Sequence, residues 1–369
     1  MHYGLFGMKA VTKHIASWLF PIFAGLAAGL AVLLWLKPAV DESTLRHSYA
    51  EVVQRTAPSV VNIYTTQIPP TSSPNKGQQY MEEMLQEPSR ERILGSLGSG
   101  VIVSPDGYIL TSHHVIRDAE EILVALPDGR ETQAKIVGVD PETDLALLRI
   151  GLSQLPYLSL GHNEPISVGD VVLAIGNPLG LGQTVSMGIA SATGRNQVGI
   201  TTFENFIQTD AAINRGNSGG ALVDSRGNLI GINTAILSHS GGWEGIGFST
   251  PATTANQIMA DLIDYGRVIR GWLGVTVENL TPSTAKSLGL AELTGGLVRR
   301  VELGSPAHAG DLRSGDILIG INGKKVKDGF EAMNIITQTR PHTTLTLTVL
   351  RQHKEVTLQV TIGLRPPAQ

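Results

Sequence analysis

Three residues, well separated along the chain, have side chains suited to nucleophilic acyl transfer. Ser218 lies in a glycine-lined turn, GNSGG at residues 216–220, His114 follows a strand-like segment, and Asp144 stands at the head of the apolar segment 145–148. A serine hydroxyl becomes a nucleophile when a base takes its proton and a carboxylate orients that base. The sequence therefore predicts a catalytic set of Ser218, His114 and Asp144, although a GNSGG turn taken alone could also be purely structural.

The same turn offers donors for the negative charge that develops during acyl transfer. Glycines allow the backbone to turn sharply, so the amides of Gly216 and Ser218 can converge on one point. We predict that these two N–H groups form an oxyanion hole.

Composition excludes several other chemistries and implies more than one domain. The 369 residues suggest two or three domains. The chain has no cysteine, which excludes a thiol nucleophile, zinc–thiolate sites and disulfides. Its formal net charge of −4 comes with no basic stretch, so a nucleic-acid partner is not expected. No His or carboxylate cluster has ligand spacing, so we expect neither a metal nor another cofactor.

Short strand-like segments separated by turn signals predict a mainly β protein. Many short strands at this spacing favour paired antiparallel barrels, which we place in a domain at residues 46–265. Helical spacing of apolar residues predicts a linking helix over Thr253–Tyr265. A second β-rich domain is predicted at residues 266–369.

The first 45 residues predict a cytoplasmic tail, a transmembrane anchor at about residues 17–36 and a tether. The uncharged run from Trp18 to Leu36 has tryptophans near both ends, and Lys9 and Lys13 precede it. Nineteen residues span about 28 Å as a helix, close to the thickness of a bilayer's hydrocarbon core. The lysines favour a cytoplasmic amino terminus. A cleaved signal peptide is the alternative.

The catalytic residues, in the order His, Asp, Ser, are surrounded by segments that resemble the HtrA family of serine proteases. Within that family the chain resembles the DegS-like branch, which is membrane-anchored and carries one PDZ domain. The matching segments are LGSGV (97–101), GYILT (107–111), DLA (144–146), AIGNP (174–178), QTDAAIN (208–214) and GIGF (245–248). The resemblance implies a trypsin-like double six-stranded β-barrel domain with serine endopeptidase activity. It departs at Ser112, usually Asn, and at His113, usually not histidine; alignment on Val115 favours His114 as the base.

The resemblance also implies a substrate pocket. In trypsin-like enzymes that prefer basic residues, an aspartate lies six places before the serine, where this chain has Ala212. A small or medium apolar substrate side chain is therefore expected. Ile246 and Phe248 resemble the wall of the family's pocket, or they are ordinary core residues.

Residues 270–364 resemble a PDZ domain. The matching segments include GSPAHAG at residues 304–310 and ING at residues 321–323. The run Trp272, Leu273, Gly274 and Val275 resembles the loop that binds a peptide's terminal carboxylate, where an added strand completes the contact. The alternative is a strand with a bend.

The DegS-like resemblance implies a complete function. A DegS-like protein is a periplasmic sensor held on the bacterial inner membrane. It recognises the C-termini of misfolded outer-membrane proteins, and it cleaves a membrane-bound anti-sigma factor to start the envelope-stress response. The resemblance also implies a homotrimer and a signal-relaying role for Arg195, which could instead be an ordinary solvated residue. A general quality-control protease and an inactive PDZ adaptor are the rival functions.

Overall fold

The computed structural model of the protein describes residues 25–30, 32, 48–66, 97–161, 164–177, 182–214, 216–236, 245–287 and 294–366. Contacts divide the chain into two units, Met1–Tyr49 and Ala50–Gln369. Of the predicted anchor, only residues 25–30 and 32 are described, and they are helical with exposed Leu26 and Leu30. The rest of the anchor lies outside the described residues. Of the helices that are described, none has the length and hydropathy needed to cross a membrane.

The second unit opens with a short helix, α2 (Ala50–Thr56), and a single 3-10 turn, η2 (Ala57–Ser59). A seven-stranded antiparallel sheet follows, in the order β5-β4-β1-β2-β3-β7-β6. Its strands are β1 (Val60–Thr66), β2 (Leu97–Ile102), β3 (Tyr108–Ser112), β4 (Glu121–Ala125), β5 (Glu131–Gln133), β6 (Lys135–Asp140) and β7 (Leu145–Arg149). Every residue of β7 except the last is buried, because the strand lies between β3 and β6.

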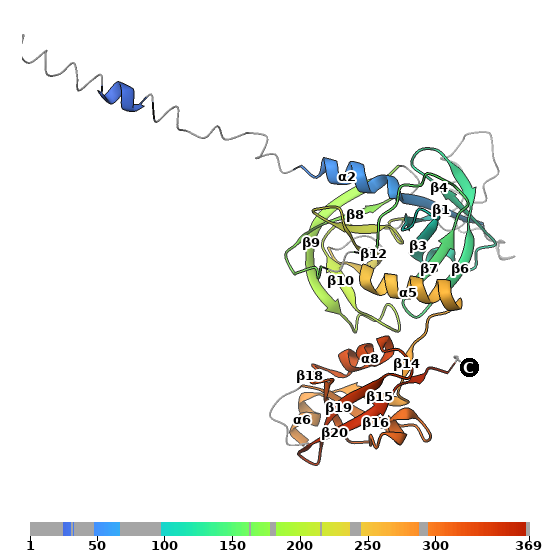
Figure 1. Cartoon of the computed structure of the whole chain (residues 1–369), viewed down its shortest axis with the longest axis vertical. Coiled ribbons are helices and arrows are strands. Elements are labelled where there is room, and N and C mark those ends of the chain that lie inside the picture. The colour runs from blue at the N-terminus through green and yellow to red at the C-terminus, as the bar shows by residue number, and fades with distance from the viewer. Residues whose placement is uncertain are drawn as a thin grey trace, which may run out of the picture. The chain divides into compact units, whose positions relative to one another are not determined.

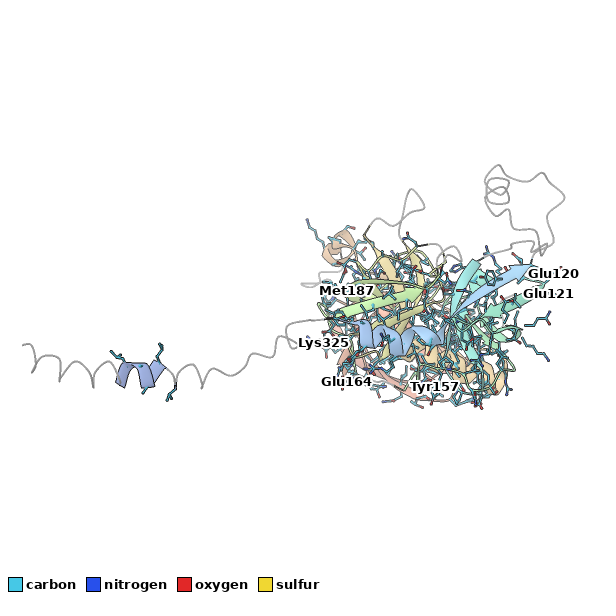
Figure 2. The ribbon with its side chains drawn as sticks, turned by 90° about the horizontal axis from the view of Figure 1, so that it is seen from above. Glu120, Glu121, Tyr157, Glu164, Met187 and Lys325 are labelled. Carbon is cyan, nitrogen blue, oxygen red and sulfur yellow. The ribbon has the colours of Figure 1, made fainter. Side chains whose placement is uncertain are left out.

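This first sheet fits the predicted six-stranded barrel, with one of its strands interrupted at Ala134 and so divided into β5 and β6. It has seven strands, and in the part of the chain that the structure describes its outer strands β5 and β6 do not pair with each other. After the turn at residues 127–129 the chain adds the short β5 to β4, then continues directly into β6 beside β7. The exposed Glu120 and Glu121 lie at the rim of this sheet, where β4 begins opposite Thr66 of β1 (Figure 2).

The second sheet is the closed six-stranded barrel that the sequence predicts, in the order β10-β13-β12-β11-β8-β9. Its strands are β8 (Val171–Gly176), β9 (Thr184–Arg195), β10 (Phe206–Thr209), β11 (Ala221–Asp224), β12 (Leu229–Ile236) and β13 (Gly247–Pro251). Apolar residues such as Val172, Ala174 and Leu222 point into its core. The two sheets lie side by side, and helix α5 (Ala252–Tyr265) packs on strands of both (Figure 1).

The linking helix is confirmed within one residue of its predicted start. α5 ends at Gly266, whose left-handed φ of 66° suits glycine and whose N–H donates to the Leu262 carbonyl. Its apolar side, including Ile258 and Leu262, is buried. Strand β14 of the next domain begins five residues beyond Gly266.

The C-terminal domain is built on one antiparallel sheet in the order β15-β16-β17-β19-β20, with β18 beside β17 and a separate β14–β21 pair. Its strands are β14 (Gly271–Trp272), β15 (Val275–Asn279), β16 (Gly296–Val301), β17 (Ile317–Ile321), β18 (Lys324–Lys325), β19 (Thr344–Arg351), β20 (Lys354–Thr361) and β21 (Gly363–Leu364), and its helices are α6 (Pro282–Ser287), α7 (Pro306–Ala309) and α8 (Gly329–Gln338). One cluster of buried side chains, among them Leu347, Val349 and Ile336, forms the core. α8 contacts β15 along the outer edge of this sheet.

Candidate active site

The structure brings His114 and Asp144 into direct contact. His114 lies in the one-turn helix α4 (His113–Ile116), immediately after β3. The Nδ1 atom of His114 is 2.6 Å from Asp144 Oδ2, and the backbone N–H of His114 donates to Asp144 Oδ1 at 2.9 Å. This double contact orients the imidazole, leaving its other nitrogen to exchange a proton.

The carboxylate is held by an unusual backbone. Asp144 has a φ of 57°, in the left-handed region that residues other than glycine rarely adopt. In that conformation its carbonyl accepts the N–H of His113 at 3.0 Å, while its side chain reaches His114. The side chain of Asp144 is 13% exposed and that of His114 is 41% exposed, so the acid is shielded while the base faces the solvent side. Strained conformations of this kind gather at functional sites.

His114, not its neighbour His113, therefore holds the position of the base. The Asp144 carboxylate accepts two hydrogen bonds from His114, whereas the hydrogen bond between His113 and Asp144 joins their main chains. This geometry favours His114 as the base, as does the alignment on Val115.

The serine turn packs directly against the end of β3. A Cβ added to Gly219 would lie 2.2 Å from the Ser99 carbonyl and 2.3 Å from Thr111 Oγ1, so only glycine fits. Gly219 also has a φ of 82°. Ser112 leads into the two histidines, so this close approach packs the serine turn against the end of the strand that His114 follows. Among the described residues, no hydrogen bond yet joins the Ser218 hydroxyl to the His114 ring, and such contacts often tighten only when substrate binds.

Two amides of the turn are available for an oxyanion. The N–H groups of Asn217, Gly219 and Gly220 are taken by backbone carbonyls. In the described part of the chain, no acceptor takes the N–H of Gly216 or Ser218, the two donors that the sequence predicts. Gly216 has a φ of 98°, which requires glycine.

The sequence did not single out the residues that brace this turn. Ser99, on β2, donates its N–H to the Ser218 carbonyl at 2.9 Å and its hydroxyl to the Gly216 carbonyl at 2.5 Å. Asn233, on β12, accepts at its backbone carbonyl the N–H of Gly219 at 2.7 Å and the hydroxyl of Ser112 at 3.3 Å. Their only sequence signal is a polar residue inside an apolar strand.

Of the three residues predicted to line the substrate pocket, Ala212 lies near the serine turn. The Ala212 carbonyl accepts the Ser186 hydroxyl at 2.7 Å and the Asn217 side-chain amide at 3.4 Å, so this segment adjoins the nucleophile. Ile246 is half-buried just before β13. Phe248 is buried with its ring 5.7 Å from the ring of Phe206, a core contact that accounts for its burial. The pocket itself stays a prediction.

The predicted carboxylate-binding loop lies at the open end of β15. The carbonyls of Leu273 and Gly274 accept the N–H groups of Ala307 and Glu302, each at 2.9 Å. No described residue accepts the N–H of Leu273 or Gly274. Gly274 has a φ of 72°, and an added Cβ would clash with Ser305. The half-buried Trp272 and Val275 flank this turn.

This fold and this site define a trypsin-type serine peptidase domain followed by a single PDZ domain. Residues 98–232 match the trypsin-like peptidase domain model, and residues 271–362 match the PDZ domain model. A solved HtrA-type protease, AlgW with a tripeptide, is 52% identical, with a TM-score of 0.72 over 87% of this chain and 98% of that one.

Curated relatives agree. A protein of Ectopseudomonas mendocina named "Probable periplasmic serine endoprotease DegP-like" is 38% identical over 91% of this chain and 74% of its own length. One of Chlamydia trachomatis with the same name is 47% identical over 73% of this chain. The chain belongs to the HtrA-type, DegP-like family of serine endoproteases. It spans about half the length of the first curated relatives, 54% for the Chlamydia trachomatis protein.

Proposed function

We propose that this protein is a serine endopeptidase of the bacterial envelope whose cleavage of a protein substrate is controlled by peptides bound to its PDZ domain. The observation that carries the proposal is the His114–Asp144 pair together with a glycine turn that packs against the end of β3, two of whose amides meet no acceptor among the described residues. Acyl transfer requires that combination of base, orienting acid and oxyanion donors, together with a hydroxyl that Ser218 supplies.

The proposed chemistry follows from these positions. The Ser218 Oγ attacks the carbonyl carbon of the peptide bond while His114 Nε2 takes the hydroxyl proton. The oxygen that becomes negative is stabilised by the N–H groups of Gly216 and Ser218. His114 then gives the proton to the departing amine as the C–N bond breaks, leaving an ester on Ser218. A water molecule, deprotonated by His114, hydrolyses that ester, and Asp144 stabilises the imidazolium in both halves.

The PDZ domain has the features needed to bind a peptide's C-terminus. The amides of Leu273 and Gly274, which meet no acceptor among the described residues, can donate to a terminal carboxylate. β15 is an outer strand of its sheet, so a peptide can add to its free edge next to α8. These features support recognition of free C-termini, and we propose those of misfolded outer-membrane proteins as the ligands.

Helix α8 offers a route from that groove to the protease domain. Asn334 of α8 donates from its side chain to the Glu204 carbonyl at 3.0 Å. The Glu204 carboxylate in turn accepts the N–H groups of Val198 and Ile200 at 2.6 Å each, and so holds the loop after β9. Arg195, at the end of β9, donates to the Gln208 side chain at 2.9 Å. We propose that a peptide displacing α8 shifts this loop, with Arg195 as a relay.

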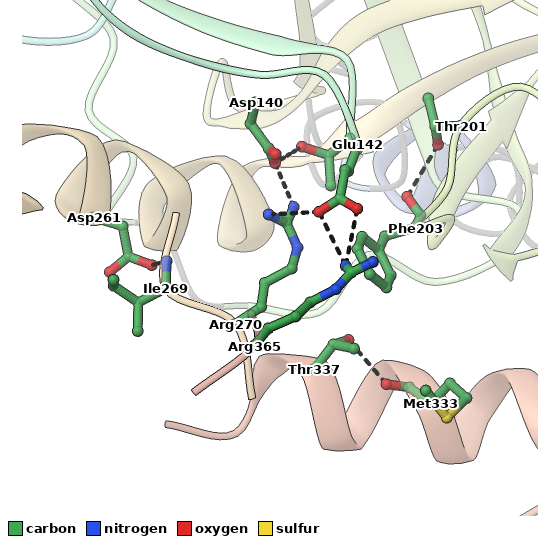
Figure 3. A network of polar contacts seen from close by, with 11 residues as sticks. Asp140, Glu142, Thr201, Phe203, Asp261, Ile269, Arg270, Met333, Thr337 and Arg365 are labelled. Atoms are coloured by element: carbon green, nitrogen blue, oxygen red, sulfur yellow. Dashed lines mark hydrogen bonds and ion pairs between the residues drawn. The ribbon is translucent and has the colours of Figure 1, made fainter. Parts of the chain in front are cut away.

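Charged contacts connect the two domains at a second place (Figure 3). Arg270 lies 2.5 Å from Asp140 and 3.3 Å from Glu142, and Arg365 lies 2.9 Å from Glu142. Both guanidinium groups also stack over the Phe203 ring, at 4.7 Å and 5.1 Å. The loop that Glu204 holds is therefore packed against cations from the edges of the PDZ domain.

The finer functional assignments rest on the DegS-like resemblance. We propose a membrane-bound anti-sigma factor as substrate, a homotrimer as the assembly, and a single-pass inner-membrane anchor with both folded domains in the periplasm. The relatives' names support a periplasmic protease. Those names equally favour a second candidate function, general degradation of unfolded periplasmic proteins.

Cleavage of an anti-sigma factor's periplasmic domain, with and without short peptides that end in a free carboxylate, separates the candidates. A regulated sensor cleaves the domain only when the peptide is present, and amidating the peptide's C-terminus removes the stimulation. Rapid degradation of an unfolded casein without peptide would favour quality control instead. Ser218→Ala is the matched control, and cleavage that survives this substitution would refute the serine mechanism.

A further inference from the structure

The hydroxyl of Ser99 occupies a position that no catalytic role yet explains. Ser99 lies on β2 in the first sheet and is 0% exposed. It is not one of the three predicted catalytic residues. Its Oγ donates to the Gly216 carbonyl at 2.5 Å and accepts the Asn177 N–H at 2.9 Å. One buried hydroxyl therefore joins the serine turn to the segment that follows β8.

The main chain of Ser99 contacts the same turn. Its N–H donates to the Ser218 carbonyl at 2.9 Å. Its carbonyl accepts the Thr111 hydroxyl at 2.7 Å, which connects it to the strand that leads to the histidine base. Ser99 thus holds two carbonyls of the serine turn, one on each side of Asn217.

These two contacts restrain the peptide units next to those that carry the oxyanion donors. A peptide unit is planar, so fixing the Gly216 carbonyl fixes the plane of the 216–217 peptide, and fixing the Ser218 carbonyl fixes that of the 218–219 peptide. The N–H of Ser218 belongs to the 217–218 peptide, which lies between those two units. The N–H of Gly216 belongs to the peptide that precedes the first of them. Glycine has no Cβ to restrict its rotation, so the plane after Gly216 is held by outside contacts: its carbonyl accepts the Ser99 hydroxyl, and its N–H, that of Asn217, donates to the Asn214 carbonyl at 3.0 Å.

We propose that the Ser99 hydroxyl is a positioning residue for the oxyanion hole: it holds the Gly216–Asn217 peptide so that the N–H groups of Gly216 and Ser218 point at the developing oxyanion. This inference rests on the proposed serine peptidase activity. The hydroxyl touches no reacting atom, and it acts by restricting the orientation of the two donors. Its effect is felt in the transition state, because the charge that these donors stabilise develops there.

Ser99→Ala tests the role with a peptide ester or chromogenic peptide substrate, in the full chain. We expect kcat to fall about 10- to 100-fold, as for a small misplacement of catalytic groups, while KM changes by less than about 2-fold. The inhibition constant of a peptide boronate, whose tetrahedral adduct places an oxygen in the hole, should rise by the same factor as kcat/KM falls. Ser99→Thr keeps the hydroxyl and should recover most of kcat.

Thr234→Val is the matched control, because it also removes a buried hydroxyl, in this case from the second sheet. That hydroxyl lies 3.0 Å from the Thr250 hydroxyl. This variant should lower thermal stability about as much as Ser99→Ala and leave kcat near the native value. If Ser99→Ala does not fold, Ser99→Cys keeps the volume with a weak donor, and the same fall in kcat is expected.

An unchanged kcat in folded Ser99→Ala would overturn the positioning role. So would a fall in kcat that comes with a large change in KM, or with a boronate inhibition constant that does not rise as kcat/KM falls. So would a Ser99→Thr variant that folds but is as slow as Ser99→Ala. A native chain with no Ser218-dependent cleavage would instead refute the proposed activity, which keeps the two failures distinct.

Discussion

At the scale of single residues, the site depends on polar side chains and backbone conformations that apolar patterning does not specify. Residue type and order were enough to predict His114, Asp144 and Ser218, since acyl transfer requires those groups. The left-handed φ of Asp144 could not be predicted, because nothing in its neighbours' types demands it. The contact of Ser99 could not be predicted either, since its hydroxyl donates to the carbonyl of Gly216, 117 positions away in the chain.

The two adjacent histidines give a sharp test at this scale. His114→Ala should lower kcat by about 10³-fold or more, because the base that activates Ser218 is lost. His113→Ala should change kcat by less than about 5-fold, because only the main chain of His113 contacts Asp144. The measurement is steady-state cleavage of a chromogenic peptide by both variants. The reverse ranking would assign the base to His113.

The carboxylate has its own expected signature. Asp144→Asn keeps the shape of the side chain but can stabilise the wrong imidazole tautomer, so kcat should fall about 10³- to 10⁴-fold. Substrate binding should be almost unaffected, which a comparison of KM values checks. A loss of less than 10-fold would show that Asp144 does not orient the base.

At the scale of elements, the strand pattern predicted the second barrel well and the first sheet less well. The apolar segment 145–148 lies in strand β7, because burial on both sides requires such a run. The short β5 carries no such signal, since its three residues are polar and none of them is buried. The helix α8 begins after the capping residue Asp328, whose carboxylate accepts the Glu331 N–H at 2.8 Å.

The turn between β11 and β12 predicts a pH dependence of stability. Burial opposes the charge of Asp224, but hydrogen bonds from Asn228 and Arg226 outweigh it and lower the pKa of the Asp224 carboxyl. The stabilisation is therefore complete above the ordinary carboxyl pKa of about 3.9 and is lost as the pH falls through the lower folded-state value.

Asp224→Asn should lower the free energy of unfolding by about 1–3 kcal/mol at pH 7, because it removes hydrogen bonds to a charged acceptor. Urea unfolding of both proteins at pH 7 and in acid measures the effect. The difference between them should shrink in acid. A difference that is the same at both pH values would mean that the carboxylate charge contributes nothing to the turn.

At the scale of the whole molecule, the contacts between the two domains join residues far apart in the sequence. The sequence predicted each domain from its own segments, and the PDZ match at residues 271–362 confirms the second. The sequence did not predict the ion pair between Arg270 and Asp140, because the two residues are 130 positions apart and no motif surrounds either of them. The buried Asp261 shows the same limitation, since its partner Arg340 comes from the other domain.

Removing one partner of a buried pair should be costly. Arg270 is 10% exposed and Asp140 is 3% exposed, so Arg270→Ala leaves a buried carboxylate without its cation. We expect a loss of about 3–5 kcal/mol in the free energy of unfolding. The double variant Arg270→Leu with Asp140→Leu should be more stable than Arg270→Ala. Calorimetry of all three tests this, and an Arg270→Ala protein as stable as the native one would contradict it.

The most direct test of the central claim is covalent labelling of the nucleophile by a fluorophosphonate, read out by mass spectrometry of the intact chain and of its peptides. The arrangement around Ser218 predicts one adduct per chain, on Ser218 itself, formed at least about 10²-fold more slowly in His114→Ala and absent from Ser218→Ala. An adduct on another residue, or labelling at the native rate in His114→Ala, would contradict the account.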